Sequence, residues 1–529
     1  MSSAVEALPA AKLVVILEEY LAEHPAAALL EEGRVLFDMR LARYSITESH
    51  GRCLVQFWSE ERNLVRSVVE IQPRAHSLRV MTRRMGAPKP QALELVPSSD
   101  RRTPTVRDSS RRNYQRLLER VLSRAFLGAK VDGLRSAMDL EHSFGPAYVR
   151  GRLLRGTSAE AVIGVSGAES SATIDGIVTL GILWLDYCRE KADARRHFGG
   201  LKVIVPRGAH QTTAERMAWL NHAAADFQLY TLDERSEELE PIDCRDIGNQ
   251  TARLIHAFSP DAVLERCRSG IAHVLGLLPP GAQSRIEIRP RSATEVSLSL
   301  HGLEFARVRY GAAIHSFAPQ EEIFFGAGAN ETPLTPETEE LCRELCARLF
   351  ASRHRNGTHN DPLFRMQPER WLESEFRRGL AELVPSLRGD VLYSQVPALS
   401  SGDRGMLDLL TLDRNGRLAV IELKADEDLH LPLQALDYWI RVRTLNADRR
   451  HTASGGRPLS AFEREGYFSG SEVSELPPRL LLAAPALRIH PANLPVLRYL
   501  SPEVDWELVA LSEHWRQELK IVFRKRPGQ

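Results

Sequence analysis

The spacing of hydrophobic and polar positions changes in a regular order along the chain. Residues 8–30 place apolar side chains at helical spacing, interrupted by Pro25, and residues 34–96 alternate in short runs separated by Gly, Ser and Pro. The first pattern predicts a helix and the second an antiparallel β domain. From about residue 109 helical and strand-like periods alternate, which predicts an α/β unit that ends near residue 256.

The same order of patterns returns from about residue 257 onward. A helix is followed by β-rich segments, a further helix and a second region of alternating periods. The predicted fold class is therefore a multidomain α+β and α/β protein with two tandem halves, each an antiparallel β domain followed by an α/β domain. The predicted domains span residues 1–100, 101–256, 257–350 and 351–529.

Two alignments support this repeat. Tyr148–Gly167 aligns without gaps over Met406–Ala425, and both segments contain Ala-Val-Ile at the same place. A helix that starts near Thr103 aligns with one that starts near Thr332. The two aligned segments lie further apart in the second half than in the first. This difference predicts an insertion in the second half, which contains the loop "RHRNGTHNDP" and the helix with "WLESEF".

Composition narrows the class of protein. The six cysteines form no CxxC pair, which argues against a zinc site or a disulfide scaffold and fits a cytoplasmic protein. The most apolar stretch, Ile174–Leu185, is too short to span a bilayer, so we expect no membrane partner. The formal net charge is zero, so any binding of nucleic acid must come from local basic patches. The chain has 61 Arg and only 8 Lys, which makes each lysine informative.

One hairpin in the second α/β domain concentrates polar groups among apolar residues. Two strand-like runs flank Asn415–Gly416, a strong hairpin signal. Asp408 interrupts the first run, and Glu422 and Lys424 are two residues apart on the second, so their side chains project from one face. The hairpin predicts that these three charged groups meet.

This combination suits phosphodiester hydrolysis. Two carboxylates, Asp408 and Glu422, can hold a hard divalent cation such as Mg²⁺ or Mn²⁺, with the Leu423 carbonyl as a neutral ligand. The cation polarises the phosphate and lowers the pKa of an attacking water. Lys424 can orient that water or stabilise the charge that develops on the phosphate.

In these residues the last 160 or so positions resemble the PD-(D/E)XK nuclease superfamily, with Asp408 as its aspartate and Glu422-Leu423-Lys424 as its E-x-K. The resemblance implies a restriction-endonuclease-like α/β fold. Gln434 and Tyr438 are similar to the Q-x3-Y helix element of RecB-like and NucS-like members. The superfamily's first helix usually brings an acidic residue, and "ERWLESEF" offers Glu373 or Glu375, of which we favour Glu373.

The plan of a β domain followed by a nuclease domain resembles the NucS type of DNA endonuclease. It implies a Mg²⁺- or Mn²⁺-dependent deoxyribonuclease with DNA as its partner, in which the β domains contact the substrate. The chain departs from that type because it is doubled and lacks a proline before Asp408, which puts the substrate specificity in doubt.

The repeat alignment also predicts a degenerate first copy. In the alignment of Tyr148–Gly167 with Met406–Ala425, Arg150, Gly164 and Ser166 fall under the three catalytic positions. The first α/β domain is therefore expected to keep the fold and lose the metal ligands. Such a copy could form an intrachain pseudo-dimer with the active one.

Two alternatives remain open from the sequence. The chain could be a catalytically inactive nucleic-acid-binding or scaffold protein built from nuclease folds, or a nuclease gated by a ligand that binds a regulatory N-terminal half. The sequence does not choose between DNA and RNA, single and double strands, or endo- and exonuclease action, and it leaves the oligomeric state open.

Overall fold

The chain forms two compact units, and each combines a stretch from both predicted halves. The first unit comprises Met1–Arg101 and Phe258–Phe376, and the second comprises Arg102–Ala257 and Arg377–Gln529. The structure, a computed structural model, describes residues 9–31, 34–40, 42–49, 51–58, 63–74, 77–83, 90–98, 104–139, 141–193, 196–246, 253–254, 258–312, 319–328, 332–400, 403–450 and 456–528. Its mixed α/β architecture with several sheets confirms the predicted class at that level.

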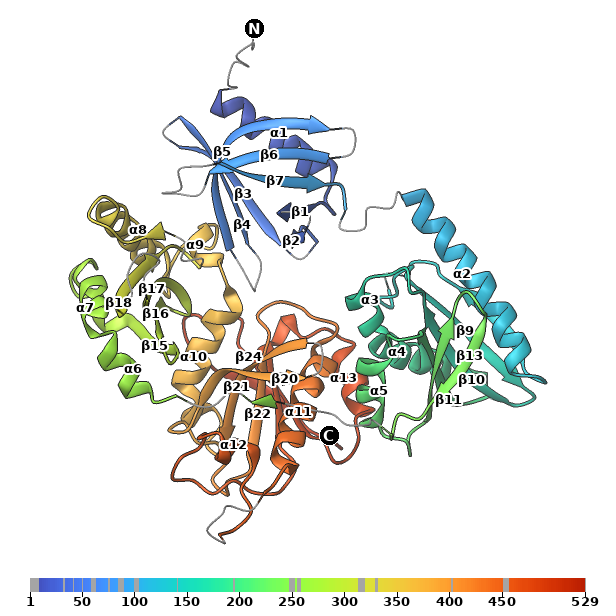
Figure 1. Cartoon of the computed structure of the whole chain (residues 1–529). Coiled ribbons are helices and arrows are strands. Elements are labelled where there is room, and N and C mark those ends of the chain that lie inside the picture. The colour runs from blue at the N-terminus through green and yellow to red at the C-terminus, as the bar shows by residue number, and fades with distance from the viewer. Residues whose placement is uncertain are drawn as a thin grey trace. The chain divides into compact units, whose positions relative to one another are not determined.

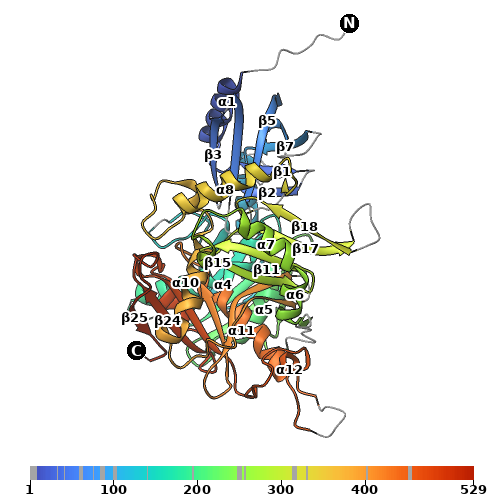
Figure 2. The ribbon, with the colours of Figure 1, turned by 90° about the vertical axis from the view of Figure 1, so that its left-hand side faces the viewer.

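The N-terminal part of the first unit is a helix across an antiparallel sheet (Figures 1 and 2). The sheet has seven strands in the order β2-β1-β7-β6-β5-β4-β3. The elements are α1 (Ala10–Glu23), β1 (Ala28–Glu31), β2 (Arg34–Asp38), β3 (Arg43–Ser49), β4 (Arg52–Trp58), β5 (Asn63–Arg74), β6 (Ser77–Arg83) and β7 (Gln91–Val96). Leu13, Leu17 and Leu21 share one helix face and enter the core of this domain. The helix predicted for residues 8–30 ends at Glu23, before Pro25, and its last residues form β1 instead.

The other part of the first unit is a second antiparallel sheet, with five strands in consecutive order from β15 to β19. Its elements are α6 (Pro260–Arg266), α7 (Arg268–Gly276), β15 (Ile286–Ser292), β16 (Glu295–Leu300), β17 (Leu303–Ala312), β18 (Pro319–Phe325), β19 (Thr332–Pro333), α8 (Glu339–Ser352) and α9 (Pro362–Arg365). Arg353 is fully buried, donates hydrogen bonds to the carbonyls of Leu300 and Met366, and lies 4.5 Å from the ring centre of Trp371. These bonds hold the segment that follows α8 against the sheet.

The second unit contains two mixed sheets of the same topology. The first runs β8-β9-β10-β11-β12-β13, and the second runs β20-β21-β22-β23-β24-β25 with β14 added at its edge. In both sheets the central strand and its two successors on one side are parallel, and the remaining neighbours are antiparallel. The tandem relation of the two α/β domains is therefore present in the fold.

The elements of the first copy are α2 (Pro104–Ala125), β8 (Lys130–Arg135), β9 (Tyr148–Arg155), β10 (Ser158–Val165), α3 (Ser171–Asp175), α4 (Ile177–Glu190), β11 (His197–Pro206), α5 (Gln211–Ala218), β12 (Asp226–Asp233) and β13 (Glu238–Ile242). Those of the second are β14 (Arg253–Leu254), α10 (Pro368–Leu383), β20 (Tyr393–Ser400), β21 (Asp403–Leu412), β22 (Leu418–Leu423), α11 (Leu431–Ala447), α12 (Ala461–Arg464), β23 (Arg479–Pro485), α13 (Asn493–Arg498), β24 (Asp505–Leu511) and β25 (Ile521–Lys525). Helix α10 begins in the first unit and ends in the second.

The second repeat anchor, between the helices near Thr103 and Thr332, is wrong. Helix α2 packs on the sheet of the first α/β copy through Leu118 and Val121, whereas α8 packs in the core of the second β domain through Cys342 and Cys346. Both helices are amphipathic, and the shared period produced the similarity.

The two α/β copies pack against each other through a reciprocal interface. The Asn221 N–H donates to the Tyr499 carbonyl, and the Ser501 N–H donates to the Trp219 carbonyl, both at 2.7 Å. The guanidinium of Arg443 lies 4.2 Å from the ring centre of Trp219, as that of Arg189 lies 5.8 Å from the ring centre of Tyr499. Paired contacts of this kind are those of a two-fold interface, so the second unit is an intrachain pseudo-dimer.

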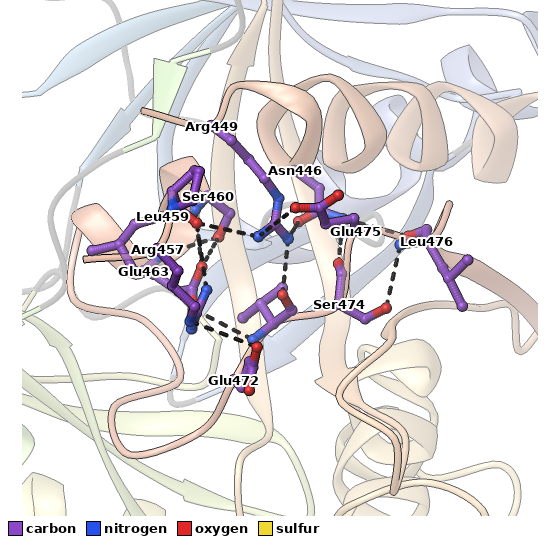
Figure 3. A network of polar contacts seen from close by, with 12 residues as sticks. Asn446, Arg449, Arg457, Leu459, Ser460, Glu463, Glu472, Ser474, Glu475 and Leu476 are labelled. Carbon is purple, nitrogen blue, oxygen red and sulfur yellow. Dashed lines mark hydrogen bonds and ion pairs between the residues drawn. The ribbon is translucent and has the colours of Figure 1, made fainter. Parts of the chain in front are cut away.

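The second copy carries a long connection between α11 and β23 that the first copy lacks. Figure 3 shows how polar contacts hold it: Ser460 and Glu463 form a capping box, and Arg457 pairs with Glu463. Arg449 donates to the Val473 carbonyl at 2.8 Å. Because these partners are largely within the connection itself, it is a folded addition to the copy that carries the predicted site.

None of the described helices has both the length and the apolar composition needed to cross a bilayer.

Candidate functional site

The predicted hairpin is confirmed, with a longer turn than Asn415–Gly416 alone. Leu412 pairs with Leu418, so five residues connect the strands, and Gly416 has φ of +78°. The Asp413 carboxylate accepts hydrogen bonds from the N–H groups of Asn415 (2.8 Å) and Arg417 (3.0 Å). An αL glycine after a tight turn forms a bulge, which adds one residue to this side of the hairpin.

At the other end of the hairpin, Asp408 bonds to the backbone of the neighbouring strand. The described pairing of β21 with β22 ends at Leu409 and Ile421. One step further, the Leu423 N–H donates to Oδ2 of Asp408 at 3.0 Å. A carboxylate thus occupies the place that a backbone carbonyl would take in a continuous ladder, and it lies beside the Glu422-Leu423-Lys424 segment.

The backbone of that segment points one carbonyl toward Asp408. The Lys424 N–H donates to the Ala483 carbonyl on β23 at 3.0 Å. Because backbone groups alternate in direction along a strand, the N–H and C=O of Leu423 both point toward β21. Two carboxylates and this carbonyl form a set of hard oxygen donors, the type that Mg²⁺ and Mn²⁺ prefer.

Glu422 and Lys424 are charged side chains in a buried part of the sheet. Glu422 is 4% exposed, and every residue of β22 is buried. The Lys424 Nζ lies 3.9 Å from Oε1 of Glu422 and 4.0 Å from Oδ2 of Asp428. Burying a carboxylate costs several kcal/mol, and the Lys424 ammonium offsets a part of this cost. Buried charged groups that lie close together are candidates for a functional site.

Helix α11 presents Tyr438 to the same group. Burial and the nearby charges of Glu422 and Asp408 raise the pKa of Tyr438 above its usual value, while Lys424 lowers it. The guanidinium of Arg441 lies 5.7 Å from the Tyr438 ring centre. The structure therefore brings four of the predicted residues together: Asp408, Glu422, Lys424 and Tyr438.

Gln434 lies one helical turn before Tyr438 and is half-buried. Its side chain has no hydrogen-bond partner among the described residues, so its amide remains available to a ligand. Asp428 and Arg441 were not predicted. Asp428 belongs to the acidic run 426–428, which begins two residues after Lys424, and this run was the available signal.

Glu373 and Glu375 lie on α10 in the first unit, and both are engaged in ion pairs there. The Glu373 carboxylate accepts from Arg289 at 3.2 Å and from Arg370 at 2.9 Å. Oε1 of Glu375 accepts from Trp371 Nε1 at 3.2 Å and lies 2.9 Å from Nδ1 of His301. These partners account for the burial of both glutamates without a metal ion.

The first copy shows that the predicted repeat register is wrong by one residue along β10. A Cβ at Gly164 would lie 2.8 Å from the Tyr114 hydroxyl on α2, so this position faces α2. Glu422 faces α11 and Tyr438, and α11 is the counterpart of α4 on the opposite face. A one-residue slip turns every side chain of a strand to the other face, so Gly164 is not the counterpart of Glu422.

Strand pairing supplies the corrected register. Ile163 packs in the α4 core and pairs with Arg150 across its hairpin. We therefore align Ile163 with Glu422 and keep the predicted alignment of Arg150 with Asp408. With these alignments the hairpin is one residue longer in the second copy, and the extra residue is the bulge at Gly416. The next strands agree with this register. Ile163 pairs with Val203 and Glu422 pairs with Leu482, and the spacing from Val203 to Leu482 equals the spacings from Pro206 to Pro485 and from Asp226 to Asp505.

The first copy has other groups at these positions. Val165 has the place of Lys424. Arg189 and Arg443 occupy equivalent places of the interface and so fix the alignment of α4 with α11. In this alignment Leu180 has the place of Gln434, and Trp184 has that of Tyr438. Arg150 keeps the place of Asp408 with the opposite charge; it is fully buried, lies 4.5 Å from the ring centre of Phe144, and burial lowers its pKa to about 10. The expectation that the first copy retains the fold without the ligands is thus supported through different residues from those predicted.

Within the described ranges, no cluster of three or more His, Cys, Asp or Glu side chains is arranged as a metal site. The candidate site at Asp408, Glu422 and the Leu423 carbonyl has two acidic side chains and is therefore smaller than such a cluster. No model of a known protein family and no curated protein sequence matches the chain.

Proposed function

We propose that the second α/β copy hydrolyses phosphodiester bonds, with DNA as the substrate and Mg²⁺ or Mn²⁺ as the cofactor. The observation that carries this proposal is the bond from the Leu423 N–H to the Asp408 carboxylate. It holds one acid beside a strand segment that bears the second acid, Glu422, and the cation, Lys424. The alignment of these groups supports the resemblance to the PD-(D/E)XK nucleases.

Asp408, Glu422 and the Leu423 carbonyl would hold the metal ion. When bound, such an ion lowers the pKa of a water and withdraws charge from the phosphate. The ammonium of Lys424 is directed by Glu422 and Asp428 and stabilises negative charge on the phosphate oxygens. The Tyr438 hydroxyl, whose pKa is raised, stays protonated at neutral pH and serves as a hydrogen-bond donor.

A positively charged helix in the same unit supports a polyanionic substrate. Helix α2 contains six arginines and two acidic residues, Asp108 and Glu119. Arg112 and Arg116 are exposed on it, whereas Arg120 pairs with Glu237 at 2.5 Å. In a chain with no net charge, this local excess is the kind of patch that contacts phosphates.

The test is cleavage of labelled single-stranded, duplex, branched and mismatched DNA with Mg²⁺ or Mn²⁺, comparing the wild type with Asp408→Ala and Lys424→Ala. We expect metal-dependent products from the wild type and a loss of about 10²–10³-fold or more in each variant. Glu373→Gln serves as a comparison, because its carboxylate is held by two arginines.

The competing function is a nucleic-acid-binding scaffold without catalysis. One observation favours it: the chain already contains an α/β copy that keeps the sheet while apolar residues and an arginine occupy the catalytic positions. DNA binding by all of these proteins without cleavage of any substrate would support the scaffold and overturn the nuclease.

A further inference from the structure

Helix α11 carries Gln434 and Tyr438, and the degenerate copy contacts it directly. We propose that the degenerate copy is an intrachain activator, in which Arg216 is a positioning residue that holds α11 in the orientation needed for catalysis. This inference rests on the proposed function, because it concerns the same site.

The contact is a bidentate ion pair between the copies. Arg216, on α5 of the first copy, is 6% exposed. Its Nε lies 2.9 Å from Oδ1 of Asp437 and its Nη2 lies 2.7 Å from Oδ2, and its third nitrogen donates to the Asp175 carbonyl at the end of α3. Two parallel bonds fix the carboxylate in the plane of the guanidinium, which a single bond would not do.

Asp437 directly precedes Tyr438, so this pair sets the rotation of the helix about its axis. Successive side chains on a helix are about 100° apart, and fixing one therefore fixes its neighbour. The Tyr438 side chain lies close enough to Glu422 and Asp408 for their charges to raise its pKa. A displacement of about 1 Å at a reacting group can cost about 10²-fold in rate, so the orientation of α11 has catalytic weight.

A second contact holds the beginning of the same helix. Nδ1 of His430, the residue before α11, lies 3.1 Å from the Thr179 hydroxyl on α4 of the first copy. The His430 N–H donates to the Asp428 carboxylate at 2.7 Å, and Asp428 also faces Lys424. The degenerate copy thus touches α11 at its start and near its middle.

The Arg216 pair breaks the pseudo-symmetry of the interface. Trp219 and Tyr499 occupy equivalent places, and each contacts an arginine of the opposite copy, Arg443 and Arg189. The counterpart of Arg216, at the spacing that relates Trp219 to Tyr499, is the apolar Val496. The counterpart of Asp437, at the spacing that relates Arg443 to Arg189, is the apolar Leu183. The ion pair therefore exists only toward the helix that carries the site.

The experiment compares the full-length wild type with Arg216→Ala, Arg216→Lys and the charge exchange Arg216→Asp/Asp437→Arg. We expect kcat for DNA cleavage to fall about 10²-fold in Arg216→Ala, with KM and Mn²⁺ affinity unchanged, and about 10-fold in Arg216→Lys, which keeps the charge and loses the bidentate geometry. The charge exchange should recover most of the loss.

The matched control is Tyr499→Phe, which removes bonds to Asp186 (2.5 Å) and Arg189 (2.9 Å) at the pseudo-symmetric place on α4. It should leave kcat within about twofold of the wild type, as expected for a position remote from the transition state. Wild-type kcat in Arg216→Ala, or an equal loss in Tyr499→Phe at equal thermal stability, would overturn the inference.

Amide hydrogen exchange separates this inference from the proposed function. Arg216→Ala should accelerate exchange in residues 431–447, whereas Tyr499→Phe should do so in residues 177–190. A wild type without cleavage, together with this exchange pattern, would reject the nuclease and retain the positioning contact. Unchanged exchange in residues 431–447 would reject the positioning contact itself.

Discussion

The two α/β copies of the second unit have the same topology, but at one equivalent place the second copy has charged and polar residues and the first has apolar ones. The second copy places the buried Glu422 and the partly buried Lys424 and Tyr438 there, and the first buries Ile163, Val165 and Trp184. Because both sheets have the same strand order and directions, the charged groups are not required for the fold. Residues that a fold does not need, and that are costly to bury, are those expected to serve chemistry.

The largest expected effect comes from giving the second copy the residues of the first. Glu422→Ile/Lys424→Val should abolish cleavage, a loss of at least about 10³-fold, because it removes a metal ligand and the cation together. The same change should leave the free energy of unfolding unchanged or raise it by about 1–4 kcal/mol, since apolar residues replace a buried ion pair. Cleavage rates and denaturant unfolding measure both effects. A stability loss would mean that the charges are structural.

The converse change should damage the fold of the first copy. Ile163→Glu places a carboxylate in a core lined by Trp184 and Leu201, and we expect the free energy of unfolding to fall by about 3–5 kcal/mol. Urea unfolding checks this, with Ile163→Val as the control that retains the apolar character. A loss below about 1 kcal/mol would show that this pocket tolerates charge and weaken the contrast between the copies.

The contact between the copies should respond to pH through His430. Desolvation by burial lowers the pKa of His430. The charge of Asp428 opposes this shift, and those of Arg216 and His490 reinforce it. A lowered folded-state pKa means that the unfolded chain binds the proton more readily, so stability is present above the unfolded pKa of about 6.5 and is lost as the pH falls below it. We expect the free energy of unfolding to decrease between pH 8 and pH 5.5, and His430→Gln to show a smaller decrease. Equal slopes in the two proteins would contradict this.

The smallest expected effect concerns the basic helix. If Arg112 and Arg116 contact phosphates, replacing both by Ala should lower the slope of log binding constant against log salt by about two, as each contact contributes about 0.9. The control is Arg120→Ala, because Arg120 is paired with Glu237. Fluorescence anisotropy with a duplex at several salt concentrations measures the slope. An unchanged slope would place the DNA on another surface.

The sequence predicted the hairpin and its polar residues because Asn-Gly turns and interrupted apolar runs are local signals. The repeat register inferred from the sequence was one residue off. Ala-Val-Ile is a continuous apolar run, which does not show which of its side chains point to which face of the sheet, and the bulge at Gly416 shifts the alignment of the second strand in one copy alone. A second signal for the repeat itself was present: "ADFQLYTLDE" from Ala225 and "VDWELVALSE" from Val504 align without gaps. The interleaving of the halves and the Arg216 contact depend on tertiary packing, which local patterns do not contain.

The metal site proposed for the second copy is tested most directly by Mn²⁺ binding, measured by electron paramagnetic resonance, in the wild type and in two variants that change equivalent hairpins. Asp408→Asn alters the proposed ligand, and Ile163→Val alters the position in the first copy that corresponds to Glu422. We predict Mn²⁺ binding by the wild type and by Ile163→Val, and its loss in Asp408→Asn. Binding that survives in Asp408→Asn, or no binding by the wild type at millimolar Mn²⁺, would contradict a metal-dependent site in the second copy.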